Sequence, residues 1–108
     1  MTAGLDDLRS AFAELTALHG WVPLQTPRSL LLALTGRVGA VASIVQWAPD
    51  AGPDTVTREL RDELADCLVY LTALADALGV DVVDDAVTRI RRAVEHSRTR
   101  PRTQEETP

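Results

Sequence analysis

The stretch from Thr26 to Trp47 reads TPRSLLLALTGRVGAVASIVQW, and it decides the fold class. A threonine before a proline is a strong helix start, because the hydroxyl caps free backbone amides and proline fits the first helical position. From Leu30 to Val45 the segment is apolar on nearly all sides. A helix of this kind is buried on more than one face. The stretch therefore predicts a central helix, from Pro27 to about Trp47, inside a helical bundle or an oligomer.

The residues before this stretch predict one more helix. Apolar side chains recur at helical spacing from Leu5 to Leu18, and Gly20 can take the left-handed conformation that ends a helix. Between the two helices, residues 20–25 predict an extended connection that carries Trp21.

The residues after the stretch predict two further helices. The first begins after Asp54 or Thr55, either of which can cap it, and ends at about Leu78. The second runs over about residues 82–97, behind the cap Asp81. No segment has the alternating pattern of a strand, so we expect an all-α four-helix bundle.

The end of the chain differs from the rest in composition. Residues 99–108 carry charges and prolines without an apolar anchor, which predicts a disordered tail. Residues 1–98 then form a single domain. A helical layer this short buries a limited core, so we expect the apolar surface to be shared in a homo-dimer or homo-tetramer.

The net charge and the cysteine content restrict the classes of partner and the cellular compartment that we expect. The net charge of −5 argues against nucleic acid and anionic membranes as partners. The apolar stretch around Arg37 is interrupted by that charge and looks too short to span a bilayer. The single cysteine, Cys67, excludes an intrachain disulfide and is expected to be part of the core. With no signal-peptide pattern at the N-terminus, these features favour a cytoplasmic protein.

One pair of acids could carry chemistry. Glu63 and Asp66 are three residues apart on a predicted helix, so they project from the same face. Such a pair can hold Mg²⁺, which prefers oxygen ligands and keeps waters that a phosphate can displace. Taken alone the pattern is weak, because carboxylates at this spacing are usually solvated.

Three motifs together carry a resemblance to a known family. They are Trp-Val-Pro-Leu-Gln-Thr-Pro-Arg at 21–28, Leu-Thr-Gly-Arg-Val-Gly at 34–39 with Gln-Trp at 46–47, and Glu-Leu-x-x-Glu-Leu-x-Asp-x-Leu-x-Tyr-Leu at 59–71. In order and spacing the chain resembles the MazG-like nucleotide pyrophosphohydrolases, in their dCTP-pyrophosphatase-like branch. The resemblance covers about residues 5–95.

The resemblance implies an activity and a site. Members hydrolyse a nucleoside triphosphate to the monophosphate and pyrophosphate. They use Mg²⁺ held by four carboxylates: a Glu-x-x-Glu pair on the central helix, and the pair that corresponds to Glu63 and Asp66. The cations neutralise phosphate charge and help to generate the attacking water. The resemblance also implies that Trp21, Trp47 and Tyr70 line a base pocket, and that subunits assemble as dimers of dimers.

The chain departs from the family pattern on the central helix. The expected acids fall at Arg37 and Ala40, and a further acid common in the family falls at Ser43. A shifted register does not restore them, because no Asp or Glu occurs between Glu14 and Asp50. The central helix therefore supplies no carboxylate. The chain resembles the family, but its metal site is degenerate.

The exchange changes the electrostatics of the site. Two opposite charges about 4 Å apart attract by on the order of 4 kcal/mol at an effective dielectric constant near 20. Loss of two acids and gain of Arg37 should therefore weaken Mg²⁺ binding severely. We expect Arg37 to pair instead with Glu63 or Asp66, since the guanidinium fork suits a carboxylate. A contact of Arg37 with phosphate, or simple solvation, stays open as an alternative.

Two smaller departures accompany this one. The histidine that the branch carries after its first tryptophan is replaced by Gln25, and the asparagine or acid of the last helix is replaced within Arg-Ile-Arg-Arg-Ala at 89–93. Those arginines could face phosphate or stand in solvent. Trp21, Trp47 and Tyr70 could equally be packing residues.

Two functions follow as alternatives. The first is a nucleotide pyrophosphohydrolase with reduced or lost Mg²⁺-dependent catalysis, in which Glu63 and Asp66 are the remnant of the metal site and any Mg²⁺ takes its other ligands from water, substrate or another chain. Trp21, Trp47, Tyr70 and Arg37 would then contact the nucleoside triphosphate. The second is a pseudoenzyme, kept as a nucleotide-binding or protein-interaction module, for example in a hetero-oligomer with an intact relative.

Overall fold

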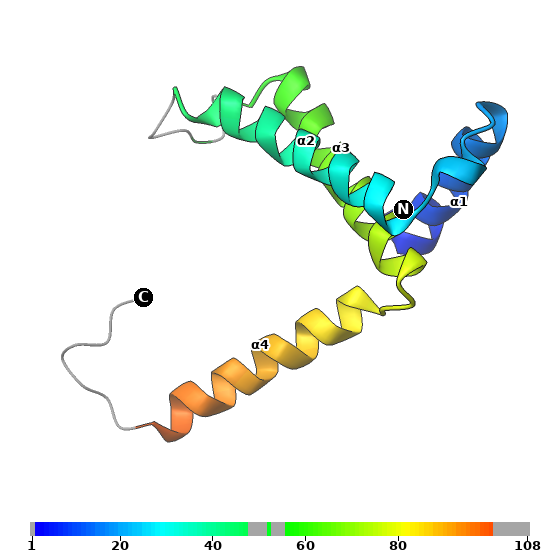
Figure 1. Cartoon of the computed structure of the whole chain (residues 1–108). Helices are drawn as coiled ribbons and strands as arrows, with labels where there is room; N and C mark the ends of the chain where they lie inside the picture. The colour runs from blue at the N-terminus through cyan, green and yellow to red at the C-terminus, as the bar shows by residue number, and fades with distance from the viewer. Residues whose placement is uncertain (1, 48–51, 53–55, 101–108) are drawn as a thin grey trace.

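The computed structural model describes residues 2–47, 52 and 56–100. These residues form four α-helices and one 3₁₀ turn, and no strand occurs among them (Figure 1). The elements are α1 (Leu5–Leu18), the turn η1 (Val22–Leu24), α2 (Pro27–Val45), α3 (Arg58–Ala77) and α4 (Val82–Thr99). The all-α class is confirmed, and so are the bounds predicted for α1.

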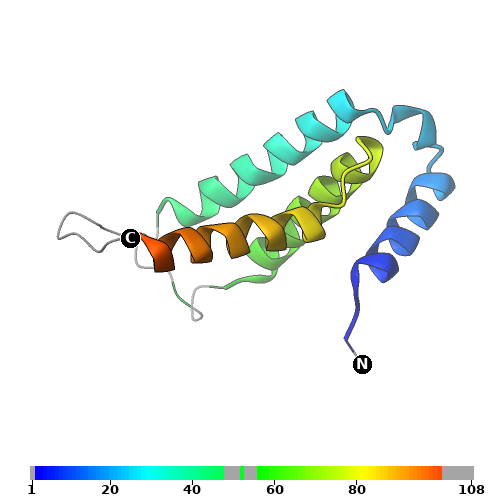
Figure 2. The same cartoon turned by 90° about the horizontal axis from the view of Figure 1, so that it is seen from below.

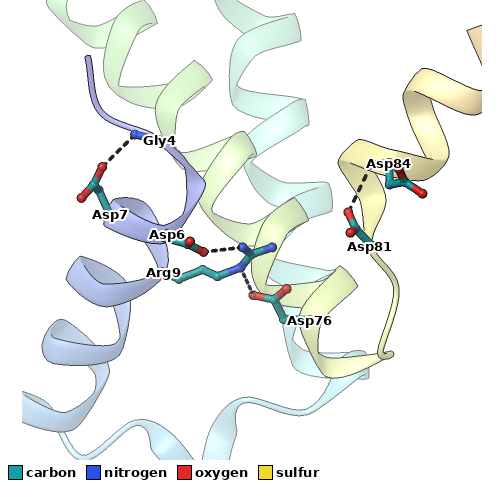
Figure 3. Close-up of polar contacts among 7 residues, drawn as sticks. All are labelled: Gly4, Asp6, Asp7, Arg9, Asp76, Asp81 and Asp84. Atoms are coloured by element: carbon teal, nitrogen blue, oxygen red, sulfur yellow. Dashed lines mark hydrogen bonds and ion pairs between the residues drawn. The ribbon is translucent and has the colours of Figure 1, made fainter. Parts of the chain in front are cut away.

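Side chains at the helix starts act as the sequence predicts. The Thr26 hydroxyl accepts a hydrogen bond from the Ser29 amide at 3.2 Å, directly before Pro27 at the start of α2. The Asp81 carboxylate accepts one from the Asp84 amide at 3.1 Å and caps α4 (Figure 3). Each bond satisfies one of the amides that a helix start leaves without an internal partner.

The connection between α1 and α2 corrects one prediction. Residues 20–25 are not extended, because the Leu24 amide donates to the Trp21 carbonyl at 2.8 Å and closes the 3₁₀ turn. Gly20 takes a left-handed φ of 67°, which ends α1 and reverses the chain. Pro23 has a fixed φ that suits the start of such a turn. The tight turn holds Trp21 close to the end of α1.

Three helix ends differ from their predicted positions. Thr57 caps α3 by accepting from the Leu60 amide at 3.2 Å, whereas the predicted caps Asp54 and Thr55 lie outside the described residues. A threonine fits this role at any start, so the sequence alone does not select among neighbouring candidates. α2 ends at Val45, two residues before the prediction, and α4 continues to Thr99. The predicted tail lies almost wholly in residues 101–108, which are outside the described part.

The helices are arranged around one antiparallel pair. α2 and α3 lie side by side along most of their length (Figure 1). α1 contacts the C-terminal part of α3 and crosses it at a wide angle (Figure 1). α4 turns away after Gly79 and extends apart from the other three, with little contact to them (Figure 1). Seen from below, α4 crosses in front of α3 (Figure 2). The α2–α3 pair is therefore the frame on which any site must be built.

The buried core is small. Among the described residues, the buried ones lie on α1, α2 and α3: Thr16, Leu30, Leu60, Thr72 and Ala75. Large apolar side chains on the outer face of α2 and along α4 remain exposed, among them Leu31, Leu32, Val87 and Ile90. The single chain thus leaves much of its apolar surface uncovered.

The length of α2 corrects the prediction that this apolar stretch is too short to span a bilayer. By length and composition α2 could cross a membrane, with a mean hydropathy of 1.4 over its most apolar window. This criterion is weak, because the core helix of a bundle satisfies it as well. In this chain α2 packs along α3 and carries Arg37, which makes ion pairs with α3.

An ion-pair cluster joins α1 to α3. The Arg9 Nε donates to Asp76 at 2.9 Å, and its Nη1 donates to Asp6 at 3.0 Å (Figure 3). The hydrogen bond to Asp76, followed by the one to Asp6, raises the pKa of the Arg9 guanidinium, so Arg9 stays charged at physiological pH. The pair with Asp76 links residues 67 positions apart in the sequence.

The capping role of Thr26 can be tested by substitution. Thr26→Ala removes the acceptor for the Ser29 amide and should lower the free energy of unfolding by about 1 kcal/mol. Thr26→Ser keeps the acceptor and should stay near the wild type. Urea denaturation followed by circular dichroism measures both. Equal losses in the two variants would contradict the capping account.

The link between α1 and α3 can be tested through hydrogen exchange. Arg9→Gln removes the charge that binds Asp76 and should speed amide exchange in α1 more than in the α2–α3 pair. Arg61→Gln, on an exposed part of α3 and without an ion pair to any described residue, is the matched control. Unchanged protection of α1 in Arg9→Gln would show that apolar packing alone holds this helix.

Candidate functional site

The two acids predicted as metal ligands lie on α3 and face α2. Glu63 is mostly covered, with 19% of its side chain exposed, whereas Asp66 is 47% exposed. They are less than one helical turn apart, which is why both reach the same partner across the helix interface. The sequence placed these residues on one face, and the structure brings that face against α2.

Arg37 is that partner. Its Nη1 donates to both carboxylate oxygens of Glu63, at 3.4 and 3.3 Å, and lies 3.9 Å from Asp66 Oδ2. The pairing predicted from the sequence is therefore present. The predicted fork is not, because one nitrogen serves both carboxylates. Nε and Nη2 have no hydrogen-bond partner among the described residues. With 44% of its side chain exposed, Arg37 keeps part of its guanidinium free.

These residues do not fit a magnesium site. The described part of the chain holds no group of three or more carboxylate, histidine or cysteine side chains that could hold a metal ion. The two acids that do approach each other share their space with a positive charge. Glu63, Asp66 and Arg37 together carry a formal charge of about −1, against about −4 for four carboxylates. A divalent cation would meet little attraction at this position.

A hollow of about 220 Å³ lies beside the first turns of α2. Trp21 and Tyr70 form aromatic walls, and the remaining lining comes from η1 and the first turns of α2: Leu24, Gln25, Ser29, Leu30 and Ala33. His19 stacks on Trp21 with ring centres 4.4 Å apart, which fixes the indole at the end of α1. Two of the three predicted aromatic contact residues are thus brought together.

A second hollow shares Tyr70 with the first. It has a volume of about 200 Å³ and lies between α1 and α3, where Phe12, Asp66 and Tyr70 are part of its lining. Phe12 meets Tyr70 edge to face, with ring centres 5.9 Å apart. Tyr70 therefore lines both hollows, and Asp66, which makes an ion pair with Arg37, lines the second.

Trp47 is not part of this arrangement. It follows α2, whereas Trp21 precedes it, and a helix of 19 residues is about 28 Å long. Trp47 is 83% exposed. One chain cannot bring both tryptophans to one base, so the three predicted aromatics do not form a single pocket here.

The sequence prediction missed Phe12 and gave Gln25 no role of its own. Phe12 follows the apolar spacing of α1 and was indistinguishable from a core residue by pattern alone. Gln25 lies in a turn whose path depends on Gly20 and Pro23. The contact of Phe12 with Tyr70 depends on the angle between α1 and α3, and the place of Gln25 depends on the turn η1, neither of which the sequence pattern predicts.

Comparison with known proteins identifies related chains. No family model matches the sequence. The chain is 38% identical over 92 residues to mouse dCTP pyrophosphatase 1, covering 80% of this chain and 54% of the mouse protein. It is 43% identical over 84 residues to the human protein of the same name, covering 72% of this chain and 49% of the human one. The chain thus spans about half the length of these relatives.

A solved structure supports the fold independently. A pyrophosphatase from Archaeoglobus fulgidus superposes with a TM-score of 0.69 over 93% of this chain and 96% of its own. The two sequences are 24% identical, so this likeness bears on the fold alone.

The lack of fit to magnesium is open to a direct test. In calorimetry, Mg²⁺ titrated into the wild-type protein should give no saturable binding. Arg37→Glu/Ala40→Glu should bind at least about tenfold more tightly, because the exchange adds two negative charges and removes a positive one about 4 Å from Glu63. Tight binding by the wild type that disappears in Glu63→Ala would overturn the interpretation.

Proposed function

Because the chain belongs to the MazG-like family, in its dCTP-pyrophosphatase-like branch, we propose that it binds a nucleoside triphosphate with reduced or lost Mg²⁺-dependent hydrolysis. The family reaction would convert the triphosphate to a monophosphate and pyrophosphate. One observation carries the proposal: Arg37 lies 3.3 Å from Glu63 and 3.9 Å from Asp66, at a position where the resemblance implies an acid.

The proposed loss of catalysis follows from the difference between the charge of Arg37 and that of a divalent cation. Water attack on a phosphate requires neutralisation of the phosphate charge and a lowered pKa of the attacking water, and divalent cations supply both. Arg37 supplies one fixed positive charge, but it cannot coordinate and acidify a water as a metal does. Glu63 is already hydrogen-bonded to Arg37 through both carboxylate oxygens, so the carboxylate is less available to contact an attacking water. The cluster is therefore poorly suited to activate water.

The chain can still bind a nucleotide when catalysis is lost. Nε and Nη2 of Arg37 have no partner among the described residues and can donate to phosphate oxygens. Trp21 and Tyr70 offer aromatic faces on which a base can stack. Tyr70 and Asp66 also line a second hollow together with Phe12. The retained parts are therefore those that recognise the nucleotide rather than those that cleave it.

A second copy of the chain would complete the assembly. α2 includes Gly36 and Gly39, and a Cβ atom at either position would meet no atom within 4 Å beyond the helix's own backbone, so another helix can approach closely. The exposed apolar residues of α2 and α4 would be covered in a homo-dimer or homo-tetramer. Trp47 would then reach a base held by the other copy. The compartment consistent with a free Cys67 and this fold is the cytoplasm.

A protein-interaction module is the second candidate. The observation that favours it is α4, which extends away from the other helices with its apolar residues exposed. An intact relative could cover this face in a hetero-oligomer and supply the missing acids. In that case the activity would appear only in the mixed assembly, and this chain would contribute nucleotide contacts.

A pyrophosphate-release assay tests the proposed loss of catalysis. Over the common ribonucleotides and deoxyribonucleotides with Mg²⁺ or Mn²⁺, the wild type should release pyrophosphate at least about a hundredfold more slowly than Arg37→Glu/Ala40→Glu. Adding Asp66→Ala to the double variant should remove the gain. Fast turnover by the wild type that Asp66→Ala abolishes would refute the loss and establish an active enzyme.

A further inference from the structure

The indole of Trp21 has one aromatic partner within the described part of the chain. His19 stacks on it with ring centres 4.4 Å apart and ring planes only 15° from parallel. Trp21 lines the aromatic hollow together with Tyr70, whereas His19 is not part of that lining. The imidazole therefore covers the indole from outside the hollow.

The backbone brings these two rings together. His19 caps the end of α1, Gly20 follows with its left-handed φ of 67°, and the Trp21 amide donates to the Thr16 carbonyl at 2.8 Å. The Trp21 carbonyl in turn accepts from the Leu24 amide at 2.8 Å. The backbone of Trp21 is thus held on both sides, while the residue as a whole is 37% exposed. The stack with His19 helps to decide where the indole lies.

Proton uptake by His19 changes the strength of this stack. A neutral imidazole attracts an indole mainly by dispersion. A protonated imidazole is in addition a cation over the face of a tryptophan ring, which is the best aromatic partner for a positive charge. Histidine is the side chain whose charge ordinarily changes between pH 5 and 8. A fall in pH through this range should therefore tighten the hold on Trp21.

The charges around His19 leave Trp21 as its partner. On α1 the nearest acid is Glu14, which lies five residues earlier and on another side of the helix. The turn η1 carries no charged side chain, the first turn of α2 carries Arg28, and Tyr70 is the titratable residue that lines the hollow from α3. No described residue makes an ion pair with His19.

We propose that His19 is a proton-sensitive clamp on Trp21, which orders one wall of the aromatic hollow as the pH falls below neutral. An indole that is already held loses less freedom when a ligand stacks on it, so the clamp raises nucleotide affinity at lower pH. This consequence rests on the proposed function, whereas the clamp itself does not. An exposed cation–π contact corresponds to a change in affinity of about two- to fivefold.

The fluorescence of Trp21 tests the clamp without any nucleotide. In a Trp47→Phe background Trp21 is the one tryptophan left in the chain. Its emission should fall in a single step between about pH 8 and pH 5, because a protonated imidazole in contact with an indole quenches it. His19→Gln should remove the step. His19→Phe keeps a ring that cannot take up a proton and should remove it too.

The second histidine of the chain is the matched control. His96 lies on α4, apart from Trp21, so His96→Gln should keep the step. A step that persists in both His19 variants, or no step with His19 in place, would refute the clamp. If neither His19 variant folds, NMR spectra of the wild type decide, because the indole N–H signal of Trp21 should shift together with the ring signals of His19. Independent shifts would refute the clamp.

Calorimetry with CTP in EDTA tests the consequence for binding. Between about pH 8 and pH 6 the affinity of the wild type should rise about two- to fivefold more than that of His19→Gln. The comparison of the two proteins cancels the titration of the nucleotide itself. An equal pH dependence in both would refute the coupling of the clamp to the site. No binding of CTP at either pH would refute the proposed function, while the fluorescence step would still establish the clamp.

Discussion

The contact between α2 and α3 is the frame of the molecule. Among the described residues, Arg37 supplies the positive charge that forms ion pairs across it. Arg37 meets Glu63 and Asp66 where the two helices face each other. The same helix pair places the aromatic hollow at one end and leaves Trp47 at the other. An acid at position 37 would set three negative charges together and would require a counter-ion. With arginine there, the interface carries its own counter-ion.

On the proposed function, the scaffold persists while its chemistry changes. A structural ion pair that is partly exposed contributes modestly to stability, so Arg37 need not hold the fold together. It does change what the site can bind. Metal ions need several oxygen ligands around one point, whereas a phosphate needs donors, and the free edge of Arg37 offers donors. With one guanidinium against two carboxylates, the cluster attracts cations much less than a site of four carboxylates would.

Local signals in the sequence predicted most of the helices. The Thr26-Pro27 start, Gly20 and the Asp81 cap each act within a few residues, so their effect could be read without the fold. The pairing of Arg37 with the α3 acids was also predictable, since Arg37 stands where an acid of the site belongs. The single-nitrogen geometry was not, because it depends on the separation of the two helices.

The candidate pocket was harder to predict for the same reason. Phe12 and Gln25 become neighbours of Tyr70 and Trp21 only through the angle of α1 and the turn η1. Trp47 was assigned to the same pocket from the resemblance, but the length of α2 separates it from Trp21 within one chain. Contacts within one element follow from spacing, whereas contacts between elements follow from packing that the sequence pattern leaves open.

If a guanidinium has taken the place of the metal, as we propose, nucleotide affinity with and without metal measures this most directly. CTP binding by the wild-type protein, followed by calorimetry in EDTA and then in excess Mg²⁺, should be as tight without metal as with it, and should weaken in Arg37→Gln. An affinity that depends on Mg²⁺ and is unaffected by Arg37→Gln would contradict the account.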